Sequence, residues 1–400
     1  MRAALAAASE DQIVFDLAGI QGRYESLIRE LPGVSVRFAM KACPVDEVLA
    51  CLSTKGAGFD AASPNEIAQA IRTGVPIGKI HYGNTIKSDR NIIDAHRLGV
   101  RDFATDSVED VTAIAAHAAG SRVFCRLATS GDGALWGFSQ KFGCSPTDAV
   151  HVMETARAAG LTPSGLSIHV GSQQMRAEAW QDAFDCLAEV LAALNQRGIL
   201  PDHINLGGGL PALGYLDRRG MPLDPPMDKI FAAIRDGMQR LREVSGSPLD
   251  FLMEPGRHLV ADHGAIRTHV VRLSARQLIG DERQHWLYLS CGKFNGLYEM
   301  DELQYPLVFP SHEGGSSRAG QPDQPGGQYV PAVLAGPTCD SDDGFSAEHG
   351  LVQVPETAAS GDPVWIFSCG AYAISYMTQG FNGFGPLPYT CIPGRRGGPA

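Results

Sequence analysis

The chain has 400 residues, which at roughly 150 residues per domain predicts two domains or one large barrel with an addition. It is 44% hydrophobic and 19% charged, an ordinary globular composition that excludes disorder as the main state. The formal net charge is −11, so we expect no broad basic face and no nucleic acid as partner.

We expect neither a membrane span nor export. No stretch approaches the roughly 18 consecutive apolar residues of a span, and the first twelve residues are too weakly apolar for a secretory signal. The cysteines number nine, an odd count, and form no CxxC pairs. This pattern favours reduced thiols in the cytoplasm over a disulfide framework or a zinc site.

Short strand-like runs recur in the first third of the chain at a near-constant period. Their starts lie 21 or 22 residues apart, which leaves room for one helix of about three turns and two short loops. The runs cover residues 37–42, 58–63, 80–85, 102–106 and 123–127.

The segments between these runs carry helix signals. Ser63, Pro64 and Glu66 combine a capping box with proline at the first helical position, and Gly74 predicts the end of that helix. Ser107 predicts the N-cap of another helix.

Three further strand-like runs follow at wider spacing, at 165–170, 203–206 and 251–254. Eight strands alternating with helices predict parallel strands with right-handed crossovers and a closed (β/α)8 barrel. A doubly wound open sheet is the rival architecture, but no GxGxxG motif follows the first strand.

After about residue 265 the pattern changes to strands without long helices, which predicts an all-β second domain. These strands cover 270–273, 285–289, 329–334 and 363–367. The stretch 312–328 is rich in Gly, Ser, Pro and Gln and is expected to form a mobile loop. The tail 393–400 is expected to be disordered.

Ionisable and glycine residues gather at the C-terminal ends of the predicted barrel strands, where the active site of such a barrel lies. They are Lys41, Asn84, Asp106, Arg126, His169, the glycine triplet 207–209, Glu254 and Arg257. Taken one at a time, each has a structural explanation: a strand-end lysine snorkels to solvent, a glycine triplet makes a turn, and EPGR is a charged turn.

As a set, these residues predict pyridoxal phosphate. This cofactor needs a lysine that forms a Schiff base, a phosphate cradle and a partner for its pyridine nitrogen. Lys41 would supply the amine, while the backbone N–H groups of the triplet and the guanidinium of Arg257 would hold the phosphate. Glu254 would keep the nitrogen protonated, so that the ring withdraws electrons from the substrate's α-carbon, and His169 would stack on the ring.

Five motifs in order then make the chain recognisable: FAMKA at 38–42, SIHVGS at 167–172, GGG at 207–209, EPGR at 254–257 and GPTCDS at 336–341. They resemble the fold-type III pyridoxal-phosphate decarboxylases, the ornithine, lysine and diaminopimelate decarboxylase group, and most of all its bacterial ornithine decarboxylase-like members. The resemblance runs from about residue 12 to 392. It implies a C-terminal β-barrel or sandwich domain and a head-to-tail homodimer.

The resemblance also implies three segments. Residues 1–18 would contain a strand near Ile13 that joins the β domain, residues 19–265 would form the cofactor-binding barrel, and residues 266–400 would form the β domain.

A role for each matching residue follows from the resemblance. Lys41 is the Schiff-base lysine, His169 stacks on the ring, and Glu254 pairs with the pyridine nitrogen. Asp60 and Arg126 support Lys41 and the ring. The remaining cofactor contacts would come from Ser172, Gly208, Gly209, Gly256, Arg257 and Tyr372.

A loop donated across the dimer interface would carry Cys339 and Asp340. Cys339 would protonate the α-carbon after carbon dioxide leaves, and Asp340 would hold the substrate's distal amine. Ornithine decarboxylases of the eukaryotic type have Tyr-Asp where this chain has the sequence YEMD at 298–301, so the second amine ligand is Glu299 or Asp301. Diaminopimelate decarboxylases have Cys-Glu-Ser where this chain has CDS at 339–341, which favours a substrate with a terminal amine.

We therefore expect decarboxylation of a basic L-amino acid, foremost ornithine to putrescine in polyamine biosynthesis, with no metal. Lysine, diaminopimelate or a modified amino acid are alternative substrates. A racemase of the same fold is a further alternative, but alanine racemases place an arginine where this chain has Glu254. The last alternative is a non-catalytic protein related to these enzymes that regulates polyamine synthesis. The joint presence of Lys41, Glu254 and Cys339 argues against it.

Overall fold

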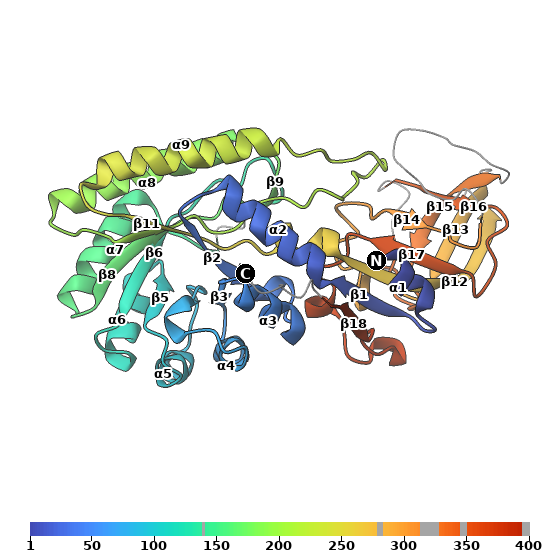
Figure 1. The fold of residues 1–400 in the computed structure, drawn as a ribbon, viewed down its shortest axis with the longest axis horizontal. Coiled ribbons are helices and arrows are strands. Elements are labelled where there is room, and N and C mark those ends of the chain that lie inside the picture. Colours follow the sequence, from blue (N-terminus) through green and yellow to red (C-terminus); the bar gives the residue numbers. More distant parts are fainter. Residues whose placement is uncertain (138–140, 278–282, 313–327, 345–349, 394–400) are drawn as a thin grey trace, which may run out of the picture. The chain divides into compact units, whose positions relative to one another are not determined.

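The computed structural model describes residues 1–137, 141–277, 283–312, 328–344 and 350–393 (Figure 1). The chain forms two compact units. The barrel unit consists of Gln21–Pro211 and Pro225–Gly256, and the β unit of Met1–Ile20, Ala212–Asp224 and Arg257–Ala400. The division of the chain into residues 1–18, 19–265 and 266–400 stays a prediction.

Eight parallel strands close into a barrel in the order β10-β11-β2-β3-β4-β5-β6-β8, as predicted, and the doubly wound sheet is excluded. Their central residues are almost all buried because the sheet is covered by side chains on both faces. The strands are β2 (Val34–Ala39), β3 (Gly58–Ala61), β4 (Ile80–Tyr82), β5 (Asp102–Thr105), β6 (Arg122–Arg126), β8 (Thr162–Ser167), β10 (His203–Asn205) and β11 (Asp250–Met253).

The crossover helices line the outside of the barrel, and α8 and α9 lie side by side (Figure 1). The predicted caps are confirmed: Ser63 Oγ accepts the Glu66 N–H at 3.3 Å, and Ser107 Oγ accepts the Asp110 N–H at 3.3 Å. The crossover helices are α3 (Asp46–Thr54), α4 (Pro64–Arg72), α5 (Asp89–Arg97), α6 (Val108–His117), α7 (Pro146–Ala158), α8 (Glu178–Gln196) and α9 (Met227–Ser245), and α2 (Leu17–Glu30) precedes the first barrel strand.

Several barrel strands are shorter than predicted. The run 37–42 is strand only as far as Ala39, and η1 (Met40–Ala42) is a single 3-10 turn closed by a hydrogen bond from Cys43 N–H to Met40 C=O at 3.1 Å. The turn carries Lys41 beyond the last paired residue of the strand. Outside the barrel sheet, β7 (Ala134–Trp136) pairs with β9 (Ser172–Gln174).

The β unit has a mixed sheet, which agrees with the predicted all-β second domain. Strand β1 (Gln12–Asp16) runs antiparallel to β12 and parallel to β18, so the start of the chain joins strands from its end. The other strands are β12 (Gly264–Gln277), β13 (Arg283–Leu289), β14 (Leu307–Val308), β15 (Tyr329–Ala335), β16 (Val352–Pro355), β17 (Pro363–Phe367) and β18 (Tyr389–Ile392). Two short helices, α1 (Arg2–Ala7) and α10 (Arg257–Val260), belong to this unit.

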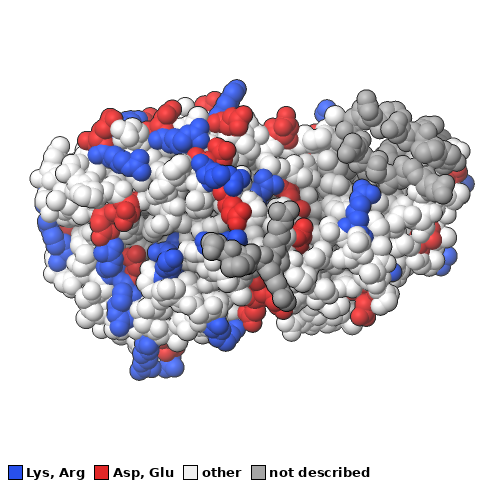
Figure 2. All heavy atoms as spheres, in the orientation of Figure 1, with Lys and Arg blue, Asp and Glu red and all other residues white. Residues whose placement is uncertain are grey.

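The predicted loop at 312–328 and tail at 393–400 fall almost wholly outside the described residues. Within the parts of the chain that the structure describes, no helix is both long and apolar enough to cross a membrane. On the face shown in Figure 2, basic and acidic side chains are interspersed over the barrel unit.

Candidate active site

The carboxyl ends of the barrel strands bring together five of the predicted residues. Asp60 lies in β3, Arg126 ends β6, and Lys41, His169 and Glu254 follow β2, β8 and β11. The charges of Lys41 and Arg126 act on both Asp60 and His169, so the two cations lie close to both side chains. The predicted convergence on one end of the barrel is therefore present.

Glu254 is held through one oxygen. Its Oε1 accepts the side-chain amide of Asn205 at 2.5 Å and lies 2.9 Å from Nε2 of His81. Among the residues described, nothing binds Oε2. A carboxylate anchored by one oxygen in this way can pair with a protonated ring nitrogen through the other.

Asp60 is buried in the barrel unit, with Oδ1 3.3 Å from Nε2 of His81, and the charge of Lys41 acts on it. Burial alone would raise the pKa of Asp60, but His81 and then Lys41 and Arg126 hold it below its ordinary value, so the group is a carboxylate. Gly83 makes room for it, since a Cβ there would stand 1.9 Å from Asp60 Oδ1.

His169 presents a neutral ring. Its Nδ1 accepts the N–H of Gly171 at 3.1 Å, which leaves the ring proton on Nε2. Burial, with the positive charges of Arg126 and Lys41, holds the pKa of His169 well below its ordinary value. A neutral imidazole of fixed orientation is suited to stacking on an aromatic cofactor.

The glycine triplet forms a turn that no other residue type fits. Gly207 and Gly209 have φ of +64° and +119°, and a Cβ on Gly207 would lie 1.9 Å from the carbonyl oxygen of Ile168. Within the described ranges, the N–H groups of Gly208 and Gly209 have no acceptor. Unpaired N–H groups in a glycine turn are donors suited to a phosphate.

The β unit contains the other predicted phosphate ligands, Arg257 and Tyr372. The guanidinium of Arg257 is buried, forms a two-pronged ion pair with Glu299 and donates to Tyr215 Oη at 2.9 Å. It also stacks 4.7 Å from the ring centroid of Tyr372, which adopts φ of +61°. Arg257 and Glu299, predicted for phosphate and substrate, are thus direct partners.

The loop that carries Cys339 and Asp340 is organised by a neighbouring residue, Asp343. The buried carboxylate of Asp343 accepts the N–H and hydroxyl of Thr338 at 3.0 and 2.7 Å and the N–H of Lys293 at 2.7 Å. Cys339 and Asp340 are exposed.

The third predicted substrate carboxylate, Asp301, pairs with the side chain of Lys293. Asp340 differs, because its Oδ1 accepts the N–H of Asp342 at 2.9 Å and no cation pairs with it among the described residues. Asp340 is therefore the predicted amine ligand whose charge is not already matched by a cation.

Sequence reasoning missed Asn205, His81 and Tyr215, and it took Asp343 for one of the carboxylates that face a cationic substrate, whereas Asp343 binds Thr338 and the Lys293 N–H. Asn205 and His81 lie in predicted strands, and a polar residue in a strand buried on both faces is the signal that marks such positions. Two predicted residues bind backbone N–H groups instead: Asn84 Oδ1 accepts the Ile86 N–H at 3.0 Å within a local turn, and Asp106 Oδ2 accepts the N–H of Gly143, 37 positions further along the chain, at 2.9 Å.

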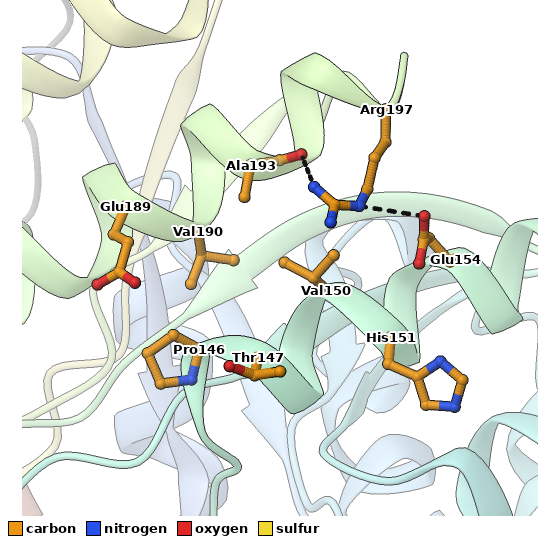
Figure 3. A pocket seen from close by; sticks show the side chains of 9 residues that line it. All are labelled: Pro146, Thr147, Val150, His151, Glu154, Glu189, Val190, Ala193 and Arg197. Atoms are coloured by element: carbon orange, nitrogen blue, oxygen red, sulfur yellow. Dashed lines mark hydrogen bonds and ion pairs between the residues drawn. The ribbon is translucent and has the colours of Figure 1, made fainter.

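A groove of about 310 Å³ lies elsewhere on the barrel unit, between α7 and α8 (Figure 3). Its walls are helix side chains such as Val150 and Val190, and Arg197 bridges it by an ion pair to Glu154 at 3.2 Å. It contains none of the predicted site residues, and we assign it no role.

The residues of the barrel end fit pyridoxal phosphate. Unpaired N–H donors at Gly208 and Gly209, an oriented carboxylate at Glu254, a neutral ring at His169 and the amine of Lys41 are the groups this cofactor requires. Whether each residue makes its predicted contact stays a prediction.

The known proteins that are similar to this chain include several amino-acid decarboxylases. The chain is 28% identical to the ornithine decarboxylase of Schizosaccharomyces pombe, covering 96% of this chain and 84% of the relative. It is 28% identical to the lysine/ornithine decarboxylase of Selenomonas ruminantium, covering 93% and 87%. It resembles the crystal structure of Vibrio vulnificus lysine/ornithine decarboxylase complexed with putrescine, with a TM-score of 0.79, 27% identity and coverage of 98% and 96%.

The family model for the pyridoxal binding domain of pyridoxal-dependent decarboxylases matches residues 17–261, which span the whole barrel. The cofactor is accordingly pyridoxal phosphate. The chain belongs to the pyridoxal-dependent decarboxylases and is a carboxy-lyase that acts on amino acids.

Proposed function

We propose that this enzyme decarboxylates a basic L-amino acid, with ornithine as its preferred substrate and putrescine as product. The observation that carries the proposal is the exposed carboxylate of Asp340, beside the exposed thiol of Cys339. The names of the relatives, ornithine and lysine/ornithine decarboxylase, support the same substrate class. Polyamine biosynthesis is the corresponding process.

The barrel residues are proposed to act at the bond between the substrate's α-carbon and its carboxylate, which breaks when carbon dioxide leaves. Pyridoxal phosphate, when bound, supplies an electron sink for the electron pair that carbon dioxide leaves on the α-carbon. Lys41 would hold the cofactor through its side-chain amine. Glu254 would face the ring nitrogen with Oε2 and keep it protonated. His169 would stack on the ring, and Asp60 and Arg126 would support Lys41 and the ring.

Phosphate binding is assigned to backbone and side-chain donors. The N–H groups of Gly208 and Gly209, with Ser172 and Gly256, would bind it. A glycine is needed at position 256, since a Cβ there would lie 2.8 Å from the Cβ of Ala42. Arg257 and Tyr372 would be its further side-chain ligands.

The loop residues act on the substrate. The thiol of Cys339 would deliver a proton to the α-carbon after carbon dioxide has left, which completes the amine product. Its backbone is fixed, because the Cys339 N–H donates to Asn382 Oδ1 at 2.9 Å. The carboxylate of Asp340 would pair with the distal ammonium, which selects substrates that carry one.

A homodimer with sites built from two chains is part of this proposal. Exposed aromatic side chains of the β unit support it: Tyr298 and Tyr376 stack with centroids 4.1 Å apart, yet are 45% and 46% exposed. Phe381, Phe384 and Tyr389 are also large and exposed. Aromatic residues at the surface are enriched in protein interfaces.

We place the enzyme in the cytoplasm. All nine cysteines are free thiols, as expected in a reducing compartment. Fractionation of cells that express a tagged chain tests the placement, and recovery with exported proteins would contradict it.

The substrate is tested by carbon dioxide release from a panel of ornithine, lysine, arginine, diaminopimelate and glutamate derivatives. The proposal expects the highest kcat/KM for ornithine and little release from diaminopimelate. Release only from a substrate without a distal cation would overturn it. A higher kcat/KM for lysine than for ornithine would support basic amino acids as the substrate class but would make lysine, and not ornithine, the preferred substrate.

A further inference from the structure

His81 lies in the barrel interior, between two carboxylates of the active site. It is the middle residue of β4, its side chain is 2% exposed, and the strand register places it beside Asp60 of β3. Its Nε2 is 2.9 Å from Glu254 Oε1 and 3.3 Å from Asp60 Oδ1. One ring nitrogen therefore faces two anionic groups.

The groups around His81 favour its charged form. Burial alone would lower the pKa of His81, but Asp60 and Glu254 raise it to about 9. Lys41 and Arg126 also act on Asp60, and the carboxyl of Glu66 interacts with both Asp60 and Lys41. At neutral pH the ring is an imidazolium that links two carboxylates from strands at different places in the chain.

His81 forms an ion pair with Glu254 at Oε1. Asn205 also binds Oε1, so both neighbours hold the same oxygen. Asn205 is neutral and can fix the position of the carboxylate, but it adds no positive charge. The imidazolium of His81 adds charge–charge attraction at the same oxygen.

We propose that His81 is a positioning residue for the cofactor: its charged ring holds the Glu254 carboxylate oriented through Oε1, so that Oε2 pairs with the protonated pyridine nitrogen. The inference rests on the proposed role of Glu254. It gives the Glu254 carboxylate a second partner, His81, in addition to Asn205. His81 does not touch the reacting atoms and acts through Glu254.

A metal site is the rival interpretation. Asp60, His81 and Glu254 offer ligand atoms within 4.8 Å of one another. Lys41 and Arg126 disfavour a cation there, because their positive charges already act on the cluster. Metal analysis of the purified protein separates the two: one equivalent of a divalent metal that disappears in His81→Leu would overturn the proposal.

The main experiment measures cofactor binding to the apo-protein by fluorescence quenching. Two ligands are compared: pyridoxal phosphate and its 1-deaza analogue, in which CH replaces the ring nitrogen. The analogue cannot pair with Glu254, so it reports all binding except that pair. We expect His81→Leu to weaken binding of pyridoxal phosphate on the order of tenfold and to leave binding of the analogue unchanged.

Two further variants sharpen the result. His203→Leu is the matched control, because His203 is also buried, lies on β10 and packs against the ring of Phe124 as His81 does. It should not change the ratio of the two dissociation constants. His81→Gln restores a side-chain N–H without charge and should recover only part of the loss. Full recovery would overturn the proposal, since charge would then play no part.

Glu254→Gln separates failure of the inference from failure of the proposed function. If this variant loses the preference for pyridoxal phosphate and His81→Leu keeps it, Glu254 has its proposed role and the inference about His81 is wrong. If Glu254→Gln also keeps the preference, the proposed role of Glu254 is wrong and the inference falls with it. Equal weakening of both ligands by His81→Leu would indicate a structural role only.

Discussion

Arg257 and Glu299 form a two-pronged ion pair that is buried within the β unit. Burial alone would lower the pKa of Arg257, but Tyr215 and Glu299 hold it well above its ordinary value. A buried pair of this kind is costly to break from one side, because the remaining charge is left without a partner. A phosphate bound at Arg257 would share the guanidinium with Glu299.

Glu299→Gln tests this sharing. We expect a loss of about 3 kcal/mol in the free energy of unfolding, since Arg257 keeps a buried charge. Added inorganic phosphate should raise the melting temperature of the variant more than that of the wild type, because the anion replaces the missing carboxylate. The double variant with Arg257→Met serves as control and should lose the phosphate response. An identical response in wild type and Glu299→Gln would place the phosphate away from Arg257.

Lys41→Ala should abolish both the visible absorbance band of the bound cofactor and nearly all activity. Lys41→Arg should do the same, because a guanidinium does not condense with an aldehyde at neutral pH. Lys55→Ala is the control, since Lys55 forms an exposed ion pair with Glu25 at 2.7 Å. Turnover of Lys41→Ala at the wild-type rate would refute the assignment of the site.

Mixing two inactive proteins tests whether each site needs two chains. Lys41→Ala has an intact Cys339 loop, and Cys339→Ala has an intact barrel. With random exchange, about half of the dimers are mixed and each contains one complete site, so activity should return to roughly a quarter of the wild-type value. Recovery should track heterodimer formation, measured with differently tagged chains. Proven exchange without any recovery would show that each site is built within one chain.

Asp340→Asn should raise KM for a diamine-forming substrate about tenfold, with a smaller effect on kcat, because the distal ammonium loses an anionic partner. The amide can still accept the Asp342 N–H, so the turn is kept. Asp342→Asn is the control, since its side chain is 76% exposed. A normal KM in Asp340→Asn, with a raised KM in Asp301→Asn, would move the amine site to Asp301.

The contribution of His81 to stability should depend on pH. Its pKa is raised from 6.5 to about 9 in the folded protein, so the stabilisation is complete below pH 6.5 and is lost as pH rises through 9. The difference in melting temperature between wild-type and His81→Leu apo-proteins should therefore shrink over this interval. The same difference measured for His203→Leu provides the reference slope. A gap that widens toward pH 9 would contradict a charged His81.

Much of the fold was predictable from sequence because its signals are local. A strand–helix period, the Ser63 cap and the turn glycines depend on residues near one another in the chain, and the barrel follows from repeating that unit. Lys41, His169 and Glu254 were identifiable for a related reason: they follow strands whose ends must meet once the barrel closes.

What the tertiary structure alone decided is which side chains touch. His81 and Glu254 meet although 173 positions separate them in the sequence, because closure of the barrel leaves only β2 and β3 between β11, which Glu254 follows, and β4, which contains His81. Arg257 and Glu299 pair through the folding of the β unit, which turned two separately predicted ligands into partners. Contacts of this kind depend on strand register and on burial, and local sequence patterns determine neither.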